Sequence, residues 1–156
     1  MVLKITIVAV GRDKDRWVTD GIAHFTKLLS RWASVSIESP TVKTAASLSP
    51  AEIMDREATA LENYIGSATT IALSDRGTAY ESADFARWLE RLQSTSGGRV
   101  TFLIGGPYGL AQSILDRADH ILSLSPLTFS HQLVRLVLLE QLYRGFSILR
   151  GTDYHK

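Results

Sequence analysis

Three segments of the sequence carry residue types that bind small molecules. One is the end of an apolar run at Leu73, the second is the glycine-rich IGGPYGL at residues 104–110, and the third is LSPLTF at residues 124–129. Glycines let a backbone approach a ligand closely and expose amide N–H groups. Ser125 and Thr128 add hydroxyls, and the backbone beside them can contact the edge of an adenine ring. On the residues alone, the two later segments remain open to the alternative interpretation of simple turns.

The carboxy-terminal end combines side chains that suit RNA contact or proton transfer. Arg144 is followed by Tyr154, His155 and Lys156, which bring cations, an aromatic ring and an imidazole together. Cations contact phosphate groups, and aromatic rings stack on bases. A solvated, frayed tail is the alternative interpretation.

Other charged residues allow structural explanations as well as catalytic ones. Arg135 and Glu140 are expected to form a structural ion pair, and Arg144, one helical turn after Glu140, can pair with it too. Asp13 and Asp75 each follow a predicted strand and remain open to a catalytic role or to that of a turn residue.

The composition excludes several classes of site. The sequence has no cysteine, which rules out disulfides, thiolate nucleophiles and cysteine-ligated metals. The histidines make none of the usual metal-binding spacings, so no metal is expected, and no serine-hydrolase G-x-S-x-G motif is present. A formal net charge of +1 means that any basic surface must be local. Without a long apolar run or a recognisable signal peptide, a cytoplasmic protein with no membrane partner is expected.

The pattern of apolar residues predicts strands that alternate with helices. Strands are expected at residues 2–10, 34–38, 69–74, 99–104 and 120–124. Helices are expected at residues 14–32, 50–65, 82–96, 111–118 and 131–149. This order predicts a single domain over residues 1–156 with an α/β fold, namely a mostly parallel sheet with helices on both faces. In such sheets ligands bind beyond the carboxyl ends of the strands, where the three segments described above lie.

Short motifs mark the expected boundaries of these elements. Ser49 and Glu52 have the spacing of a capping box, and Ser82 and Ser130 are expected to cap the helices that follow them. The Asp-Arg-Gly sequence at residues 75–77 predicts a turn that ends the third strand.

The last helix predicts a second copy of the chain. Apolar residues cover most of the circumference of residues 131–149, whereas a helix that packs on one sheet face needs only an apolar stripe. Burial on two sides, by the sheet and by a partner subunit, predicts a homodimer. A central helix of a monomer is the alternative.

The sequence resembles a known family in its last third. LIGGPYGL at residues 103–110, LSLSPLTF at residues 122–129 and the terminal Tyr-His-Lys, together with the VGR of residues 10–12, are similar to the RlmH family of SPOUT-class ribosomal RNA methyltransferases. The resemblance covers the whole length of the chain. It implies a SPOUT-type fold with a trefoil knot near the carboxyl terminus, and a homodimer.

The resemblance also implies the reaction and its cofactor. The enzyme would methylate N3 of a pseudouridine in 23S ribosomal RNA on assembled 70S ribosomes, with S-adenosyl-L-methionine as methyl donor. The family's cofactor-binding positions correspond to Leu73, Gly105, Gly106, Leu124, Ser125, Pro126, Leu127, Thr128 and Phe129.

Catalysis would then depend on the carboxy-terminal residues. N3 must lose a proton, so a nearby cation such as Arg144 would stabilise the anion, and His155 would accept the proton or position a water. Tyr154 would stack on the flipped base or form a hydrogen bond with its edge, and in a dimer these groups could complete the partner's pocket. Local cations expected to contact RNA are Arg12, Lys14, Arg16, Arg76, Arg150 and Lys156.

Two alternatives remain open at this point. A methyltransferase acting on another RNA, such as tRNA, would share the cofactor segments and differ only in substrate. A non-catalytic RNA-binding or ribosome-binding module would retain the fold and fail to bind S-adenosylmethionine.

Overall fold

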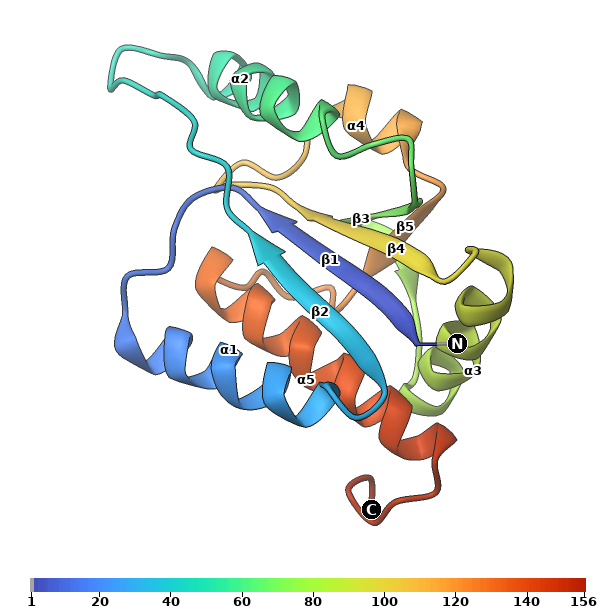
Figure 1. The fold of residues 1–156 in the computed structure, drawn as a ribbon. Helices are drawn as coiled ribbons and strands as arrows, with labels where there is room; N and C mark the ends of the chain where they lie inside the picture. Colours follow the sequence, from blue (N-terminus) through green and yellow to red (C-terminus); the bar gives the residue numbers. More distant parts are fainter. Residues whose placement is uncertain (1) are drawn as a thin grey trace.

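A computed structural model describes residues 2–156 of the chain as one five-stranded sheet with five helices (Figure 1). The strands are β1 Leu3–Ala9, β2 Ala33–Glu38, β3 Thr69–Ala79, β4 Arg99–Ile104 and β5 His120–Ser123. The helices are α1 Arg16–Leu29, α2 Pro50–Glu62, α3 Ser82–Thr95, α4 Gln112–Arg117 and α5 His131–Leu149. The sheet order is β2-β1-β4-β3-β5, and every pair of neighbouring strands is parallel.

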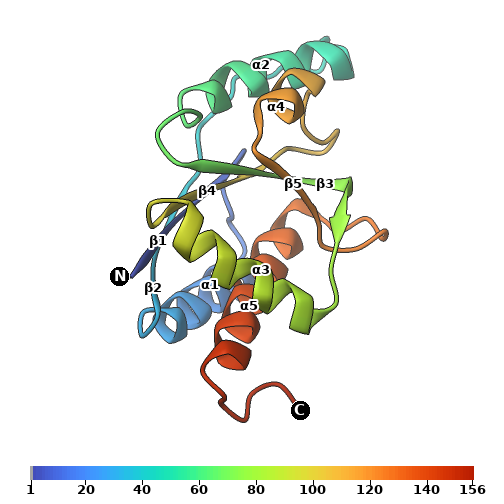
Figure 2. The ribbon, with the colours of Figure 1, turned by 90° about the vertical axis from the view of Figure 1, so that its right-hand side faces the viewer.

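Helices cover both faces of the sheet, which confirms the predicted α/β fold. Helices α1, α3 and α5 lie on one face, and α2 and α4 lie on the other (Figure 2). Two apolar clusters fill these layers, and Phe102 of β4 belongs to the larger and Leu103 to the smaller because alternate residues of a strand point to opposite faces. The trefoil knot stays a prediction.

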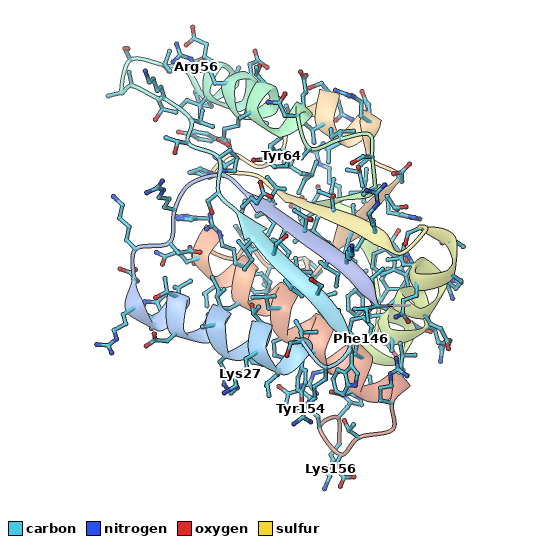
Figure 3. All side chains as sticks on the ribbon, in the orientation of Figure 1. Lys27, Arg56, Tyr64, Phe146, Tyr154 and Lys156 are labelled. Carbon is cyan, nitrogen blue, oxygen red and sulfur yellow. The ribbon has the colours of Figure 1, made fainter. Side chains whose placement is uncertain are left out.

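Helix α5 is the central helix of its layer. It packs against α1 on one flank, α3 on the other and β4 beneath. Leu138, Leu142 and Phe146 are fully buried, and Phe146 lies inside the molecule close to the carboxy-terminal tail that carries Tyr154 (Figure 3). The remaining side of α5 is partly open, and Leu133 there is 41% exposed. No helix within residues 2–156 is long and apolar enough to cross a membrane.

The predicted end of the third strand differs from the structure. Strand β3 does not end at a turn but continues to Ala79, and both Leu73 and Thr78 pair with Leu122, so residues 74–77 bulge out between them. Gly77 belongs to this bulge because a Cβ there would lie 2.6 Å from the backbone oxygen of Ile121. A glycine before a strand end thus marked a close backbone approach and not a turn.

The predicted caps are confirmed at two helices and wrong at one. Ser49 and Glu52 form both bonds of a capping box, and the Ser130 hydroxyl oxygen accepts from the backbone N–H of Leu133. Helix α3 instead begins after Glu81, which makes no side-chain capping bond, and Ser82 is its first residue.

The ion pair predicted between Arg135 and Glu140 is wrong. Arg135 is 1% exposed and donates to the carboxylate of Asp13 at 2.7 Å and to the backbone oxygens of Val10 and Gly11 at 2.9 and 2.6 Å. Positions five apart lie on different sides of a helix, and Arg135 faces inward to the end of β1. Asp13 therefore has a structural role, in which it joins the loop after β1 to α5.

Removing this buried cation should destabilise the fold strongly. In Arg135→Met the Asp13 carboxylate loses its partner while it stays buried, and breaking such a pair costs about 3–5 kcal/mol. Urea unfolding should show this loss, whereas Arg87→Ala, which removes an exposed pair with Asp84, should change stability by less than about 1 kcal/mol. Equal unfolding free energies for the two variants would contradict the assignment.

Candidate active site

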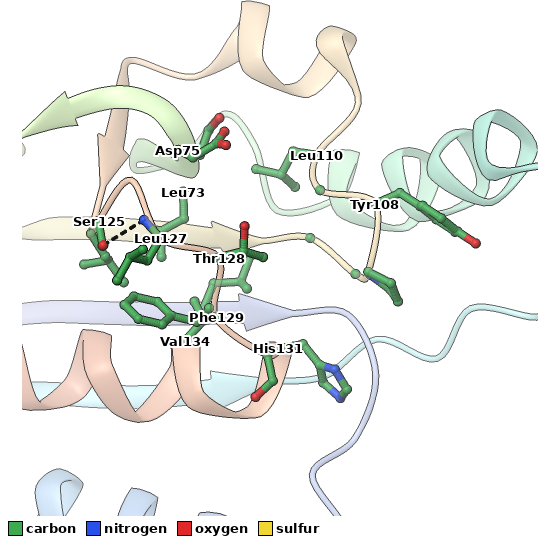
Figure 4. Close-up of a pocket in the computed structure, with 18 of the residues that line it drawn as sticks. Leu73, Asp75, Tyr108, Leu110, Ser125, Leu127, Thr128, Phe129, His131 and Val134 are labelled. Carbon is green, nitrogen blue, oxygen red and sulfur yellow. Dashed lines mark hydrogen bonds between the residues drawn. The ribbon is translucent and has the colours of Figure 1, made fainter.

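The three predicted segments meet in one cavity of about 520 Å³ (Figure 4). The first lies at the bulge within β3, and the other two follow β4 and β5; these three strands are neighbours in the sheet, so the segments lie along one edge. All predicted cofactor residues except Pro126 line the cavity: Leu73, Gly105, Gly106, Leu124, Ser125, Leu127, Thr128 and Phe129. A cavity of this size matches the usual volume of a small-molecule site, about 300–1,000 Å³.

The glycine loop after β4 is a tight turn whose first two glycines leave no space for a side chain. The backbone N–H of Gly109 donates to the oxygen of Gly106 at 3.0 Å, and Gly109 has a φ of +80°. A Cβ on Gly105 would lie 2.6 Å from the carbonyl carbon of Gly109, and one on Gly106 would lie 2.5 Å from Glu57 Oε1. The loop is therefore the tight turn that the sequence left as one alternative, and it also lines the cavity, while its role as a small-molecule cradle stays a prediction.

The loop after β5 is held by its own serines. The Ser125 hydroxyl oxygen accepts from the backbone N–H of Leu127 at 2.9 Å, and the Ser123 hydroxyl donates to the Ser125 carbonyl at 3.3 Å (Figure 4). Ser125 thus stabilises the turn, and Leu127, which is 74% exposed, stands at the cavity mouth.

The chemistry of the cavity wall suits a nucleoside with a charged tail. Leucine, phenylalanine and valine side chains alternate with backbone groups of the two loops, which gives flat apolar surface beside hydrogen-bonding groups. Asp75, which lies in the bulge of β3, lines the cavity as well, and the catalytic role left open for it stays a prediction. His131 and Val134 complete the wall from the first turn of α5, and the sequence analysis did not assign them to this site.

Glu57 lies on the opposite side of the glycine loop. This residue of α2 is 4% exposed, and its Oε2 accepts from the backbone N–H of Gly106 at 3.0 Å. Burial raises the pKa of the Glu57 carboxyl because the charged form loses its hydration, and the bond from Gly106 opposes that shift only in part. Sequence analysis missed this residue, although it precedes Ala58 on the inner face of α2 and so hinted at a buried charge.

The predicted catalytic residues gather around Glu140, which the sequence analysis had paired with Arg135. Glu140 Oε1 accepts from Arg144 Nη2 at 2.6 Å and Nε at 3.1 Å, and from the Tyr154 hydroxyl at 2.9 Å. Arg144 Nη1 lies 3.0 Å from His155 Nδ1, and the guanidinium lies over the Tyr154 ring. Because a guanidinium only donates, Nδ1 is the acceptor in this contact.

The acidity of this cluster separates the roles that its members can take. The hydrogen bonds that Arg144 donates to the Glu140 carboxylate raise the pKa of Arg144, which therefore stays a cation. Burial and the bond to Glu140 raise the pKa of Tyr154, so the phenol stays neutral and acts through its ring and its O–H. Of these groups, His155 has the lone pair on a ring nitrogen that a proton acceptor needs.

Within one chain, the cavity lies far from the cluster formed by Glu140, Arg144, Tyr154 and His155. Val134 lines the cavity and Arg144 holds the cluster, ten residues further along the same helix. At 1.5 Å per residue the two positions are about 15 Å apart along the axis. The structure therefore places the predicted cofactor residues together and the predicted catalytic residues together, at opposite ends of α5.

Comparison with known proteins defines the class. The chain matches, over residues 3–155, a family model described as "Predicted SPOUT methyltransferase". It is 41% identical over 159 aligned positions to the ribosomal RNA large subunit methyltransferase H of Carboxydothermus hydrogenoformans, with 99% of this chain and 100% of that protein covered.

Two solved structures share the fold at low identity. A probable methylase family protein of Haemophilus influenzae Rd KW20 has a TM-score of 0.54 and 11% identity over 99% of this chain and 70% of its own. A putative methyltransferase of Legionella pneumophila, solved with bound SAM, has a TM-score of 0.50 and 11% identity over 90% of this chain and 65% of its own.

The chain belongs to the SPOUT methyltransferases and, within them, to the RlmH family. Membership confirms the resemblance seen in the sequence and the expected class of enzyme, a methyltransferase whose methyl donor is S-adenosylmethionine. The particular RNA and the residues that act on it are matters for the proposal below.

The buried Glu57 carboxyl predicts a pH-dependent stability. Its pKa is raised in the folded protein above the ordinary 4.5, so folding favours the protonated form, and stability falls as pH rises from about 4.5 through the folded pKa. In Glu57→Gln this decrease is absent. The unfolding free energy of the variant minus that of the wild type, measured in urea from about pH 4.5 to 7.5, should rise with pH, and a flat or falling difference would contradict the burial of the charge.

Proposed function

We propose that this protein transfers a methyl group from S-adenosylmethionine to N3 of a pseudouridine in 23S ribosomal RNA, within the assembled 70S ribosome. The observation that carries the proposal is the convergence of three strand-end loops on one cavity, with two glycines that have no room for a side chain. The name of the relative from Carboxydothermus supports a large-subunit ribosomal RNA as substrate.

The cofactor lies in the cavity of Figure 4 in this proposal. Leu124, Leu127 and Phe129 supply apolar surface for the adenosine, while backbone groups at Gly105 and Gly106 offer hydrogen bonds. Asp75 provides a carboxylate for the cationic tail of the cofactor. When bound, S-adenosylmethionine supplies an already activated methyl group, so the protein's tasks are positioning and the management of charge.

A second copy of the chain covers the open side of α5. Leu133, Val137, Arg144 and Ile148 follow one another at helical spacing along this side, and each keeps some exposure. A twofold axis across this stripe would set the first turn of one α5 against the last turns of its partner, since a symmetric contact pairs each patch with itself. The cluster around Glu140 would then stand at the partner's cavity.

The carboxy-terminal cluster performs the proton chemistry in this two-chain site. A carbonyl oxygen of the flipped base replaces His155 Nδ1 as acceptor from Arg144 Nη1, which leaves Nδ1 free. The N3 proton would pass to that nitrogen, and S-adenosylmethionine, when bound, would supply the methyl group that N3 takes and would be left as the neutral thioether S-adenosylhomocysteine. Arg144 stabilises the negative charge that N3 and the flanking oxygens carry, and the neutral Tyr154 ring stacks on the base.

Three further parts of the proposal concern the surroundings of the site. Gln132 and Arg135 bind the loop after β1, so this loop lies beside the first turns of α5. The loop and the start of α1 carry three cations, Arg12, Lys14 and Arg16. In the proposal these cations contact RNA phosphates together with the partner's Arg150 and Lys156. Arg76 borders a second opening beside β5. A trefoil knot is supported by membership of the SPOUT methyltransferases, and a cytoplasmic location by the proposed ribosomal substrate.

The direct test is tritium transfer from labelled S-adenosylmethionine to unmodified 70S ribosomes, separated subunits and tRNA. Label on 70S particles that maps to one pseudouridine of 23S RNA is expected. Label on tRNA alone would retain the class of enzyme and overturn the substrate. No label on any RNA, from a folded protein that does not bind the cofactor, would favour a non-catalytic ribosome-binding module.

Substitutions in the cluster should lower turnover and leave cofactor binding intact. Arg144→Ala and His155→Ala each remove a group that acts on the substrate, and such groups contribute roughly 10²–10⁴-fold to a rate. Turnover on 70S ribosomes should fall within that range, while cofactor affinity by calorimetry stays unchanged. Arg91→Ala, an exposed arginine of α3, is the matched control. Normal turnover in both cluster variants would remove these residues from the catalytic role.

A further inference from the structure

Glu57 is a buried carboxylate that forms no ion pair within residues 2–156. It sits on α2 among apolar neighbours such as Ala58 and Leu61. Burying an unpaired charge costs free energy, and packed apolar residues in its place are often neutral or stabilising. Its position therefore calls for a role that an apolar residue would not fill.

Within residues 2–156, the one hydrogen bond of the Glu57 side chain connects it to the wall of the proposed cofactor cavity. Its Oε2 accepts from the backbone N–H of Gly106 at 3.0 Å, and Gly106 lines the cavity. A Cβ on Gly106 would come within 2.5 and 2.6 Å of the two carboxylate oxygens, so the loop backbone lies directly on the carboxylate. The loop is also shaped by a hydrogen bond within itself, which the backbone N–H of Gly109 donates to the oxygen of Gly106.

The bond fixes the orientation of the peptide between Gly105 and Gly106. In a trans peptide the N–H and the C=O point in opposite directions. An N–H that points to Glu57 therefore directs the Gly105 carbonyl away from α2. Glycine peptides rotate more easily than others because no Cβ restricts them, so without this acceptor the loop has other conformations available.

We propose that Glu57 is a positioning residue that holds the glycine loop in its cofactor-binding conformation through the amide of Gly106. This inference rests on the proposed cofactor pocket. Glu57 touches neither substrate nor the transferred group. It acts by fixing which backbone groups of Gly105 and Gly106 the cavity presents.

Two substitutions separate positioning from simple structural support. Glu57→Gln retains an oxygen that can accept from Gly106, whereas Glu57→Met keeps the length of the side chain and removes both the acceptor and the buried charge. Glu62→Ala, which alters an exposed glutamate of the same helix, is the matched control. Affinity for S-adenosylmethionine is measured by calorimetry, stability by urea unfolding, and the Gly106 amide by hydrogen exchange.

The proposal expects cofactor affinity and stability to respond differently. Glu57→Met should remain folded, bind the cofactor at least about tenfold more weakly and exchange the Gly106 amide faster, while Glu57→Gln and Glu62→Ala bind within about threefold of the wild type. Equal affinity of the Met and Gln variants, with the Gly106 amide exchanging fast in the Met variant alone, would overturn the proposal. If the Met variant does not fold, Glu57→Asp, whose side chain is one methylene shorter, takes its place. This variant should exchange the Gly106 amide faster and bind the cofactor more weakly than the wild type. Wild-type exchange and affinity in Glu57→Asp would overturn the proposal.

A pocket variant keeps this result distinct from failure of the proposed function. Thr128→Trp places an indole at the exposed rim of the cavity and should block the cofactor without unfolding the protein. If Thr128→Trp binds the cofactor normally, the pocket itself is wrongly placed. If it loses binding while Glu57→Met does not, only the role of Glu57 is wrong.

Discussion

The length of α5 is the constraint on which the functional account depends. The first turn of this helix lines the cavity, and Arg144, in its second half, binds Glu140 and the carboxy-terminal tail. A helix is a stiff rod, so the separation of about 15 Å between these ends cannot close within one chain. The proposed site, which needs both the methyl donor and the proton acceptor, therefore calls for a second copy of the chain, and within that proposal this separation is a stronger argument for a dimer than the apolar surface of α5 alone.

The rest of the fold fixes the position of this rod. Helices α1 and α3 pack on its flanks, and the buried Arg135 joins its second turn to the end of β1. The neighbouring strands β3, β4 and β5 bring three loops to the same edge of the sheet, where the start of α5 closes the cavity. On the other face, α2 supports the glycine loop through Glu57. All three layers thus shape the cavity: α5 closes it, the sheet supplies its loops and α2 supports the glycine loop.

The sequence predicted the elements that depend on local patterning. Apolar periodicity placed all five strands and all five helices, and the Ser49 and Ser130 caps were confirmed because capping depends on residues three apart. The irregular end of β3 was missed because Gly77 is required by contact with β5, more than forty residues later. Strand order is likewise set by long-range packing, which one sequence does not display.

The candidate site was predictable where it depends on loops after strands. The positions from Leu124 to Phe129 were located in this way, apart from Pro126, which does not line the cavity. The partner of Arg135 was not predictable, because Asp13 lies 122 positions away. Glu57 was missed for a similar reason, since its bond to Gly106 spans 49 positions. Buried charges reveal their partners only in the folded chain.

Complementation between two inactive chains tests the two-chain site most directly. Thr128→Trp has an obstructed cavity and an intact cluster, and Arg144→Ala has the reverse. After equal amounts are unfolded and refolded together, half of the dimers contain one chain of each kind, and each of these has one complete site if the cluster serves the partner's cavity. The account predicts that the mixture regains about a quarter of the methyl transfer of wild-type protein treated in the same way. An inactive mixture, alongside wild type that recovers and variants that form mixed dimers, would contradict it.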